Sequence, residues 1–364
     1  MACSHTDWLT NEEYSLQFSQ KILHNRIPVT GSIDLTYRCN FCCVHCYIVH
    51  KNKEVGSSSR ELSTDQWKSI IDDITDRGCM FLLITGGDPF LRPDFNEIYT
   101  YAKTKGLIIT VFTNGYTITE QILRTLQKYP PRLVEITLYG ATEETYTRIT
   151  GKKNGFNKCL ETIKKLQDHG INTGLKTVLM TLNVGEFYKM EKIADSFGIK
   201  FRYDPAIFPK FNGDKSPVSL RVAPEKVVQL DFQNKQRAGE WVQLHRRYKD
   251  VTLEKKLYNC GSGQTTFHIT AEGRLQPCLM ATDVTSDLKH HTFSQGWDLD
   301  IPAIRNKKPS MDNLCWDCEK NILCNYCPPF SAVEKGDENS YSEYLCALSK
   351  LRLQKITQYG QPYE

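Results

Sequence analysis

Three cysteines in the first part of the chain have a spacing that suits a metal centre. Cys39, Cys43 and Cys46 form the pattern CxxxCxxC within residues 36–47. A cubic four-iron cluster that only carries electrons is usually held by four cysteine thiolates. Three thiolates leave one iron of such a cluster free to bind a small molecule directly. The pattern therefore predicts a cluster whose chemistry depends on the missing ligand.

Two other interpretations of these cysteines stay open at this point. A structural zinc ion takes four ligands in a closed site, and here Cys42 or His45 could supply the fourth. The thiols could also be free and buried. We interpret Cys42 as a packing thiol that oxidants can reach, and His45 as a packing or stacking residue, because a lone histidine is more often structural than catalytic.

Further cysteines are concentrated in the last third of the chain. They are Cys260, Cys278, Cys315, Cys318, Cys324, Cys327 and Cys346. A CxxC pair followed by a second CxxC pair is also typical of a zinc ribbon, so zinc is an alternative here too. Long periodic segments are few in this region. We expect a small domain built around metal rather than around a large apolar core.

Composition excludes several classes of protein. The chain has 364 residues, with 46 Lys and Arg against 42 Asp and Glu, and the basic residues form no long run that would favour nucleic acid. The N-terminus lacks the apolar core of a secretory signal, and no apolar run is long enough to span a bilayer. Fourteen cysteines then fit thiolate-bound metal in a reducing cytosol better than a disulfide framework. We expect a cytoplasmic protein with no nucleic-acid or membrane partner.

The elements that must position these cysteines follow a regular order. From about residue 31, short apolar runs alternate with amphipathic helical stretches, which predicts a parallel sheet wrapped by helices. Helical spacing predicts helices over 64–76, 156–169 and about 224–248. Six strands are expected, near 31–35, 80–85, 108–113, 133–138, 175–181 and 200–204. Six strand-helix units are fewer than the eight that close a full barrel.

The CxxxCxxC loop directly follows the first expected strand, and it resembles the signature of the radical S-adenosylmethionine (SAM) enzymes. The family register selects Cys39, Cys43 and Cys46 as ligands. In that family the free iron chelates SAM, whose reductive cleavage gives a 5'-deoxyadenosyl radical that takes hydrogen from the substrate. The resemblance implies an α/β fold with a partial (β/α)6 TIM-type barrel, open at one side, whose reactive groups lie at the carboxyl ends of the strands.

Segments at other strand ends extend this resemblance. Gly86-Gly87-Asp88-Pro89 resembles the GGEP motif, whose glycines let the backbone approach the SAM ammonium, with Asp88 in place of Glu. Residues 137–140 resemble the Ser-x-Asp-Gly segment, with Tyr139 in place of Asp. The arginine of Arg-Ile-Thr-Gly resembles one that pairs with the SAM carboxylate. The resemblance thus assigns SAM contacts to Gly86, Gly87, Asp88, Pro89, Asn114, Thr137, Arg148, Thr181 and Asn183, and an adenine contact to Tyr47.

The C-terminal cysteines closely resemble the seven-cysteine SPASM pattern of radical SAM enzymes that modify peptides and proteins. One auxiliary cluster would then be fully ligated by Cys315, Cys318, Cys324 and Cys346. A second would be held by Cys260, Cys278 and Cys327, without a fourth thiolate. The last CxxC departs from the family, which has three intervening residues there. The resemblance implies three [4Fe-4S] clusters and SAM, with an auxiliary cluster accepting an electron from the substrate radical.

The expected organisation has five segments. They are an N-terminal extension (1–30), the radical SAM partial barrel (31–210), a linker and helical region (211–254), the cysteine-rich SPASM domain (255–350) and a C-terminal tail (351–364). About thirty residues before the barrel are too few for a winged-helix leader-binding domain. We therefore expect a separate leader-peptide-binding protein, and an external electron donor of the flavodoxin or ferredoxin type.

The resemblance implies hydrogen abstraction from a peptide, followed by a thioether or other crosslink, or by epimerisation. Epimerisation needs a thiol that returns hydrogen, and the four thiols not assigned to metal are not obviously placed for that: Cys3, Cys42, Cys79 and Cys159. We therefore favour net oxidation. Leu279 follows Cys278 where sulfatase maturases have Asp, which disfavours that class. The alternatives are a tetrapyrrole-modifying (haem-type) radical SAM enzyme, and a non-catalytic iron-sulfur electron carrier or scaffold.

Overall fold

The computed structural model describes residues 10–49, 60–249, 251, 254–283, 285–316 and 318–359. Cys3 and most of the first ten residues of the expected N-terminal extension lie outside this part, as do the last residues of the expected tail. Among the described residues, no helix combines the length and the apolar character that crossing a membrane requires.

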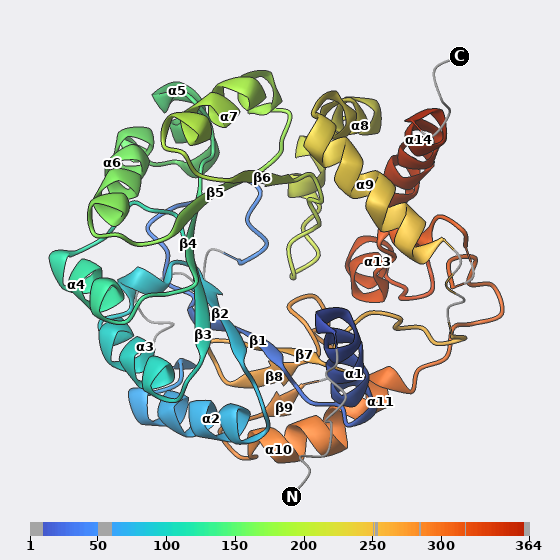
Figure 1. Ribbon diagram of the computed structural model, residues 1–364, viewed down its shortest axis with the longest axis horizontal. Helices are drawn as coiled ribbons and strands as arrows, with labels where there is room; N and C mark the ends of the chain where they lie inside the picture. Colours follow the sequence, from blue (N-terminus) through green and yellow to red (C-terminus); the bar gives the residue numbers. More distant parts are fainter. Residues whose placement is uncertain are drawn as a thin grey trace, which may run out of the picture.

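One curved sheet of nine strands runs through the described part of the chain, in the order β6-β5-β4-β3-β2-β1-β7-β8-β9 (Figure 1). All neighbours from β6 to β7 are parallel, and β8 and β9 are added antiparallel. The strands are β1 (Thr30–Thr36), β2 (Phe81–Gly86), β3 (Ile108–Thr113), β4 (Leu133–Thr137), β5 (Thr173–Val178), β6 (Phe201–Asp204), β7 (Thr266–Ile269), β8 (Arg274–Gln276) and β9 (Ser286–Asp287).

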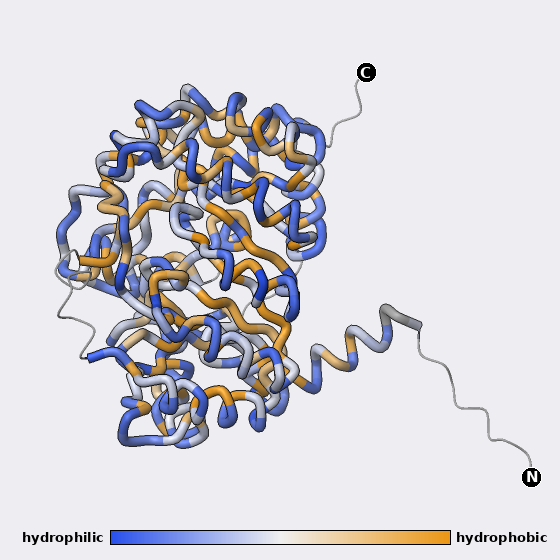
Figure 2. The backbone as a smooth tube through the Cα atoms, turned by 90° about the vertical axis from the view of Figure 1, so that its left-hand side faces the viewer, coloured by the Kyte–Doolittle hydropathy of each residue, from blue (hydrophilic) through white to orange (hydrophobic). Residues whose placement is uncertain are grey.

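Helices α2 to α7 alternate with the strands and cover the outer, convex face of the sheet (Figure 1). The N-terminal helix α1 projects away from the body (Figure 2). The helices are α1 (Asn11–His24), α2 (Thr64–Asp76), α3 (Phe95–Thr104), α4 (Glu120–Lys128), α5 (Glu143–Thr150), α6 (Gly155–Asp168), α7 (Phe187–Ser196), α8 (Pro224–Gln233), α9 (Lys235–Tyr248), α10 (Phe293–Gln295), α11 (Ile301–Arg305), α12 (Asn321–Cys324), α13 (Pro328–Lys335) and α14 (Glu343–Tyr359).

Helix α2 shows how the sequence builds this layer. Ser63 and Gln66 form a capping box that satisfies exposed backbone N–H groups at the first turn. The helix buries the four apolar residues that recur at helical spacing: Trp67, Ile70, Ile71 and Ile74. They join one large apolar core with Ile33 and Leu35 of β1. Because side chains alternate along a strand, the residue between these two, Asp34, points to the inner face of the sheet.

The six parallel strands and the expected fold class are confirmed, with two corrections to element bounds. The fifth strand begins earlier than expected and ends at Val178, because the chain then turns and Met180 N donates a 2.8 Å hydrogen bond to Asn183 Oδ1. The helix expected over 224–248 is two helices. Asn234 has an extended backbone (φ −97°, ψ 122°), and its side chain accepts from the N–H groups of Gln236 and Arg237 to cap α9.

The cysteine-rich region does not form a separate sheet, which the sequence did not lead us to expect. Strand β7 pairs in parallel with β1, with Thr30 opposite Thr266 and Ile33 opposite Ile269. On the inner face, His268 Nε2 lies 3.4 Å from Asp34 Oδ2, and both side chains are at most 2% exposed. The expected segment boundaries remain predictions, but the barrel sheet itself continues into the region assigned to the SPASM domain.

Candidate functional site

The loop after β1 gathers the three thiols of the CxxxCxxC pattern. Cys43 is buried, and Cys39 and Cys46 are half-buried. The phenol of Tyr139, two residues after the end of β4, lies near all three thiols. Its pKa is raised well above the ordinary value, first by burial and then by the nearby thiols of Cys43, Cys39 and Cys46. All three thiols therefore lie near the Tyr139 side chain, beside the carboxyl end of β4.

Cys42 points away from this region. The backbone N–H groups on either side of Cys43 are tied to the end of α5: Cys42 N donates to Thr150 O at 2.9 Å, and Val44 N to Ile149 O at 3.0 Å. Burial alternates along residues 41–44, so Cys42 is exposed where Cys43 is buried. The structure thus separates Cys42 from the three thiols that the family register selects.

The two glycines after β2 are required by the cysteine loop itself. A Cβ at Gly86, where φ is +127°, would lie 2.3 Å from Thr36 O, and one at Gly87 would lie 2.2 Å from Arg38 O. Gly87 N donates to Thr36 O at 2.8 Å and Asp88 N donates to Arg38 O at 2.9 Å. We expected glycine here so that SAM could approach the backbone. The structure adds a second reason, because the turn is hydrogen-bonded to the start of the cysteine loop.

The carboxylate of Asp88 is buried, 1% exposed, and joins two strand ends. Oδ2 accepts hydrogen bonds from Thr113 Oγ1 at 2.8 Å and Asn114 N at 2.9 Å, and Oδ1 accepts from Phe90 N at 3.0 Å. Burial raises the pKa of Asp88 to about 6. The three hydrogen-bond donors oppose this shift, because they favour the ionised form. Asp88 therefore positions the turn after β3. Pro89 begins a short 3-10 turn, where a missing N–H costs nothing.

Asn114 contacts the cysteine loop. Its Nδ2 donates to Asn40 Oδ1 at 2.7 Å and to Cys39 Sγ at 3.8 Å, and its Oδ1 accepts from Tyr116 N at 2.8 Å. An amide donor to a thiolate is the kind of contact that tunes an iron-sulfur cluster. The SAM contact that the resemblance assigns to Asn114 stays a prediction, alongside this contact to a predicted ligand.

The residues assigned to SAM after β4 and β5 divide into inner and outer positions. Asn183 is fully buried, and its Nδ2 donates to Tyr139 O at 3.1 Å and Val178 O at 3.0 Å. Thr137 is buried at the end of β4. Thr181 and Arg148 are exposed, and Arg148 Nη2 donates to Leu182 O at 2.9 Å. The structure thus brings Thr137 and Asn183 to the strand ends and leaves Arg148 on the surface of α5.

Tyr47, assigned to the adenine ring, lies among aromatic side chains. Its ring stacks on Phe208 with centroids 5.4 Å apart, and lies 5.2 Å from Phe211. Phe208 in turn contacts Phe330 of α13 edge-on, at 5.9 Å. The segment after β6 therefore connects the cysteine loop to the C-terminal region.

Two carboxylates that our sequence reasoning missed hold these loops. Glu61 Oε1 accepts from Thr36 Oγ1 at 2.6 Å and Tyr37 N at 2.9 Å, and its Oε2 pairs with Arg38 at 3.0 Å. Glu186 accepts from Ala141 N at 2.6 Å, at the start of α5. Neither glutamate stands in a motif or at a strand end, so no spacing in the sequence marks them.

The seven C-terminal cysteines fall into two groups. The pKa of Cys327 is raised to about 12, first by burial and then by Cys278 and Cys260. The pKa of Cys324 is also raised to about 12, first by burial and then by Cys315, Cys318 and Cys346. The groupings of three and of four agree with the division that the resemblance implies. Their assignment as cluster ligands stays a prediction.

The chemistry around these thiols fits iron-sulfur clusters. Backbone N–H groups hydrogen-bond to them, from Met280 and Ala281 to Cys278, and from Phe330 to Cys327. Such N–H to sulfur bonds tune cluster potentials. Among the described residues, no three His, Cys, Asp or Glu side chains are arranged to hold a single metal ion. The thiolates of a cubic cluster each bind a different iron, so they enclose a volume rather than converge on one point.

The short last CxxC has a local explanation. Asn325, between Cys324 and Cys327, adopts a left-handed conformation with φ +52°. Asparagine tolerates that region better than most residues. The left-handed residue ends α12 and turns the chain sharply, so that Cys324 joins the group of four and Cys327 the group of three.

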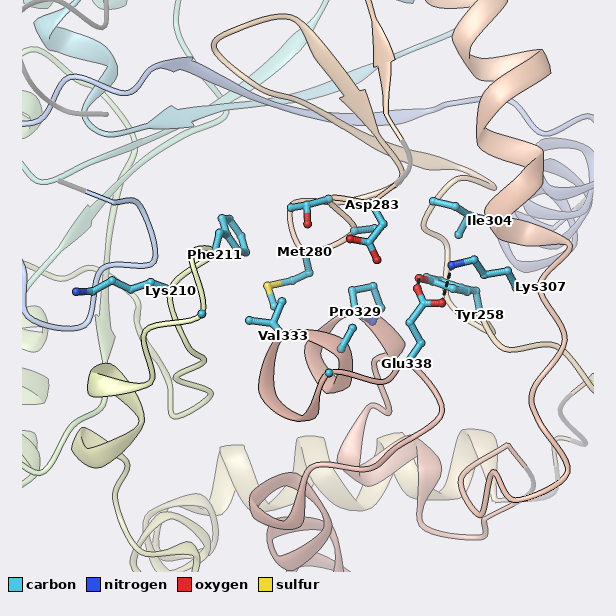
Figure 3. Close-up of a pocket in the computed structure, with 15 residues that line it drawn as sticks. Lys210, Phe211, Tyr258, Met280, Asp283, Ile304, Lys307, Pro329, Val333 and Glu338 are labelled. Carbon is cyan, nitrogen blue, oxygen red and sulfur yellow. Dashed lines mark hydrogen bonds and ion pairs between the residues drawn. The ribbon is translucent and has the colours of Figure 1, made fainter. Parts of the chain in front are cut away.

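A cavity of about 350 Å³ lies between the segment after β6 and the C-terminal region. Figure 3 shows Met280, Val333 and Pro329 facing one another across it, with Lys210 directed away. At one end Glu338 accepts from Tyr258 at 2.5 Å and pairs with Lys307 at 2.6 Å. The wall thus combines apolar side chains with polar and charged ones, among them Asp283, Lys307 and Glu338.

The cavity lies beside both a predicted auxiliary cluster and the cysteine loop. Tyr258 lies at its polar end, and the pKa of Tyr258 is raised chiefly by burial, and further by Glu338, Cys278 and Cys327. On the opposite side Phe211 lines the cavity and donates its N–H to Tyr47 O at 3.4 Å. The cavity therefore connects Tyr258, near Cys278 and Cys327, with Phe211, which is bonded to the cysteine loop at Tyr47.

Comparison with known proteins decides the family of the barrel. Residues 33–197 match the family model described as the Radical SAM superfamily. These residues form a radical SAM domain. The match covers β1 to β5 and the CxxxCxxC loop, which are the elements that assemble the three thiols, the glycine turn and Asp88.

Relatives of this chain include proteins named for two kinds of product. The chain is 28% identical over 300 residues to the antilisterial bacteriocin subtilosin biosynthesis protein AlbA of Bacillus subtilis, which covers 76% of this chain and 64% of that protein. It is 34% identical over 151 residues to the Fe-coproporphyrin III synthase of Methanosarcina barkeri, which covers 42% of this chain and 37% of that protein. The chain therefore spans less than two thirds of the length of either relative.

The fold is shared with solved structures. The Streptococcus suis protein SuiB bound to its precursor peptide SuiA superposes with a TM-score of 0.70 at 15% identity, covering 95% of this chain and 83% of that one. This likeness extends beyond the barrel into the cysteine-rich region, and it shows that the two parts together form one known architecture.

Proposed function

We propose that this chain is a radical SAM enzyme that oxidatively modifies a peptide. The observation that carries the proposal is that the thiols of Cys39, Cys43 and Cys46 all lie near Tyr139, just after the end of β4. A cluster bound there would supply the electron that cleaves SAM and so provide the radical that takes hydrogen from the substrate. The radical SAM match and the CxxxCxxC pattern support this role.

The protein's own residues would hold and shape that centre. Asn114 would donate to the Cys39 thiolate, and Glu61 would fix the backbone that leads into the loop. The C-terminal groups of four and three cysteines would hold two auxiliary clusters, giving three [4Fe-4S] clusters in all. The group of three would leave one iron without a protein thiolate, open to substrate, water or another side chain.

A peptide substrate is supported by the cavity between the thiol groups. Its apolar residues, such as Met280 and Val333, suit an apolar side chain, and its polar and charged residues suit backbone or hydroxyl groups. The relative AlbA is named for bacteriocin biosynthesis, and SuiB is solved with a precursor peptide. An external electron donor, a separate leader-peptide-binding protein and a cytoplasmic location belong to this proposal as expected from the sequence.

Tetrapyrrole modification is the second candidate, and one observation favours it. The relative with 34% identity over 151 residues is named Fe-coproporphyrin III synthase. Its likeness covers less of this chain than that of AlbA, so we rank this candidate second. A non-catalytic iron-sulfur carrier ranks last, since a carrier gains nothing from a cluster with a free iron.

The test uses anaerobically reconstituted protein with SAM and dithionite. Short peptides encoded by genes next to this one are added singly, and iron coproporphyrin is added in a parallel reaction. The proposal predicts 5'-deoxyadenosine formation stimulated by one peptide, together with loss of two hydrogen atoms from that peptide by mass spectrometry. Turnover of the porphyrin alone would instead establish the second candidate. Loaded protein that forms no 5'-deoxyadenosine with any addition would leave the carrier.

A further inference from the structure

Four side chains on consecutive strands form a row on the inner face of the barrel. Phe112 of β3 is the register partner of Glu135 of β4, and Lys176 of β5 is the register partner of Arg202 of β6. The residues that flank them along these strands belong to the apolar core under the helices: Val111, Val134, Ile136 and Leu175. Because side chains alternate, the row of Phe112, Glu135, Lys176 and Arg202 points into the barrel.

Within this inner row, both carboxylate oxygens of Glu135 accept hydrogen bonds from Arg202. Arg202 Nε donates to Glu135 Oε1 at 2.5 Å, and Nη2 donates to Oε2. Glu135 is only 4% exposed. A bidentate guanidinium-carboxylate pair is the strongest ion pair that side chains form, and it leaves the carboxylate with little capacity for a second cation.

The charged form of Lys176 therefore has only a weak ion pair with Glu135, whose oxygens already bind Arg202. Its Nζ lies 3.6 Å from Glu135 Oε2, beyond hydrogen-bond length, and 2.9 Å from the centroid of the Phe112 ring. Asp204, the other acid near it on β6, is exposed to solvent. Burial lowers the pKa of Lys176 to about 7, with Arg202 acting in the same direction and Glu135 and Asp204 opposing it. These surroundings favour the neutral amine more than those of an exposed lysine do.

Lys176 lies at the same end of the strands as the predicted reaction centre. Lys176 is the register partner of Thr137 at the carboxyl end of β4, and Ile136 is the partner of Thr113 at the end of β3. The amine thus lies at the level of the strand ends that carry the cysteine loop and the Asp88 turn. The Lys176 side chain is 19% exposed, so part of it is open to solvent.

We propose that Lys176 is the catalytic proton acceptor when the substrate radical forms its new bond. This inference rests on the proposed function. The substrate carbon loses a hydrogen atom to the 5'-deoxyadenosyl radical, and its radical then joins a substrate X–H group, where X is sulfur, oxygen or nitrogen. Forming the C–X bond releases one proton and one electron. The proton would pass to the Lys176 amine, and a bound iron-sulfur cluster would serve as the one-electron oxidant, so that one electron would enter and one would leave per turnover. The ammonium that results is stabilised by the face of Phe112.

The first test measures the amine in the loaded enzyme without any substrate. Trace acetic anhydride labels lysines anaerobically from pH 5 to pH 10, and peptide mapping gives the labelling of Lys176, with the exposed Lys153 as internal reference. The proposal predicts a midpoint for Lys176 near 7, about three pH units below the ordinary lysine range. A midpoint in the ordinary range would overturn it. Complete protection by saturating SAM would also overturn it, because the amine would then be a cofactor contact.

The second test uses the peptide identified under the proposed function. In K176M and K176R the ratio of 5'-deoxyadenosine to modified peptide should rise at least about 100-fold, since a lost general base costs roughly 10² to 10⁴ in rate. In the wild type, product formation should increase as pH rises through about 7, as the amine loses its proton. If K176R restores product, Lys176 is a structural cation and the proposal fails. If the wild type converts no peptide, the proposed function fails, and the labelling midpoint still decides whether the amine is a free base.

Discussion

Asp88 illustrates what single residues do in this site. Family members have glutamate at this position of the motif, yet the shorter acid here reaches three donors, because the strand ends of β2 and β3 lie close together. Its carboxylate is buried, and both of its oxygens already accept hydrogen bonds from the protein. The residue therefore acts through the turns that it holds, and any contact that this turn makes with SAM depends on Asp88 indirectly.

Replacing Asp88 by Asn tests this positioning role. The amide would turn an N–H₂ group towards Thr113 or Phe90, leaving buried donors unpaired at a cost of about 1–3 kcal/mol each. We expect D88N to lower the melting temperature of the loaded protein by several degrees and to bind less iron. The exposed control D168N should melt like the wild type. Wild-type stability and iron content in D88N would contradict the role.

The contrast between Cys42 and Cys43 gives a second prediction for single residues. Cys42 is exposed and directed away from the thiol group, and Cys43 is buried within it. We expect C42A to retain the full iron content, and C43A to lose about four irons per chain. Iron and sulfide counting after anaerobic reconstitution measures both. Equal iron loss in the two variants would mean that the ligand register is wrong.

At the scale of elements, the cysteine loop is held by its neighbours. The loop begins where β1 ends, and Glu61 fixes its first residues through Thr36, Tyr37 and Arg38. The glycine turn after β2 is hydrogen-bonded to the same backbone, and α5 binds the loop on the far side. Three elements that are distant in sequence thus determine where the thiols lie.

Glu61 allows this support to be tested away from the ligands. E61A removes a buried acceptor and leaves its donors unpaired, which we expect to cost about 2–4 kcal/mol. The consequence should be faster loss of iron to a chelator, with the cysteines unchanged. Glu97 on α3 has a 58% exposed side chain and forms only a surface ion pair, so E97A serves as the control. Identical rates of iron loss in E61A and the wild type would contradict the support role.

The same elements show how far the sequence predicts this fold. Apolar periodicity located the parallel strands and α2, because each buries one regular face. The break at Asn234 carried a local signal, an N-cap residue, that we passed over. The pairing of β7 with β1 had no such signal, since it joins residues more than two hundred positions apart. Glu61 and Lys176 were missed for the same reason, because their roles depend on contacts between distant segments.

At the scale of the whole molecule, the barrel and the cysteine-rich region share one sheet and enclose one cavity. Strand β7 covers the edge of β1, and the inner face at this junction holds the buried pair Asp34 and His268. The cavity lies between the segment after β6 and α13, beside thiols from the C-terminal region. The cavity thus lies beside one predicted auxiliary cluster and is joined to the cysteine loop through Phe211 and Tyr47.

Removing the cysteine-rich region should therefore disable the barrel. A chain ending at residue 249 would expose the edge of β1 and leave the buried Asp34 without His268. An uncovered edge strand is a template for aggregation, and an unpaired buried charge costs several kcal/mol. We expect this truncated chain to be aggregated when analysed by size-exclusion chromatography. A monomeric truncated chain that still binds iron would show that the barrel is independent.

The most direct test of the account compares the wild type with a variant in which Cys39, Cys43 and Cys46 are all alanine. Both are reconstituted anaerobically with iron and sulfide, counted for iron, and then incubated with SAM and dithionite. The account predicts about twelve irons in the wild type and about eight in the variant, with 5'-deoxyadenosine formed only by the wild type. Bound zinc, or fully loaded wild-type protein that forms no 5'-deoxyadenosine, would contradict it.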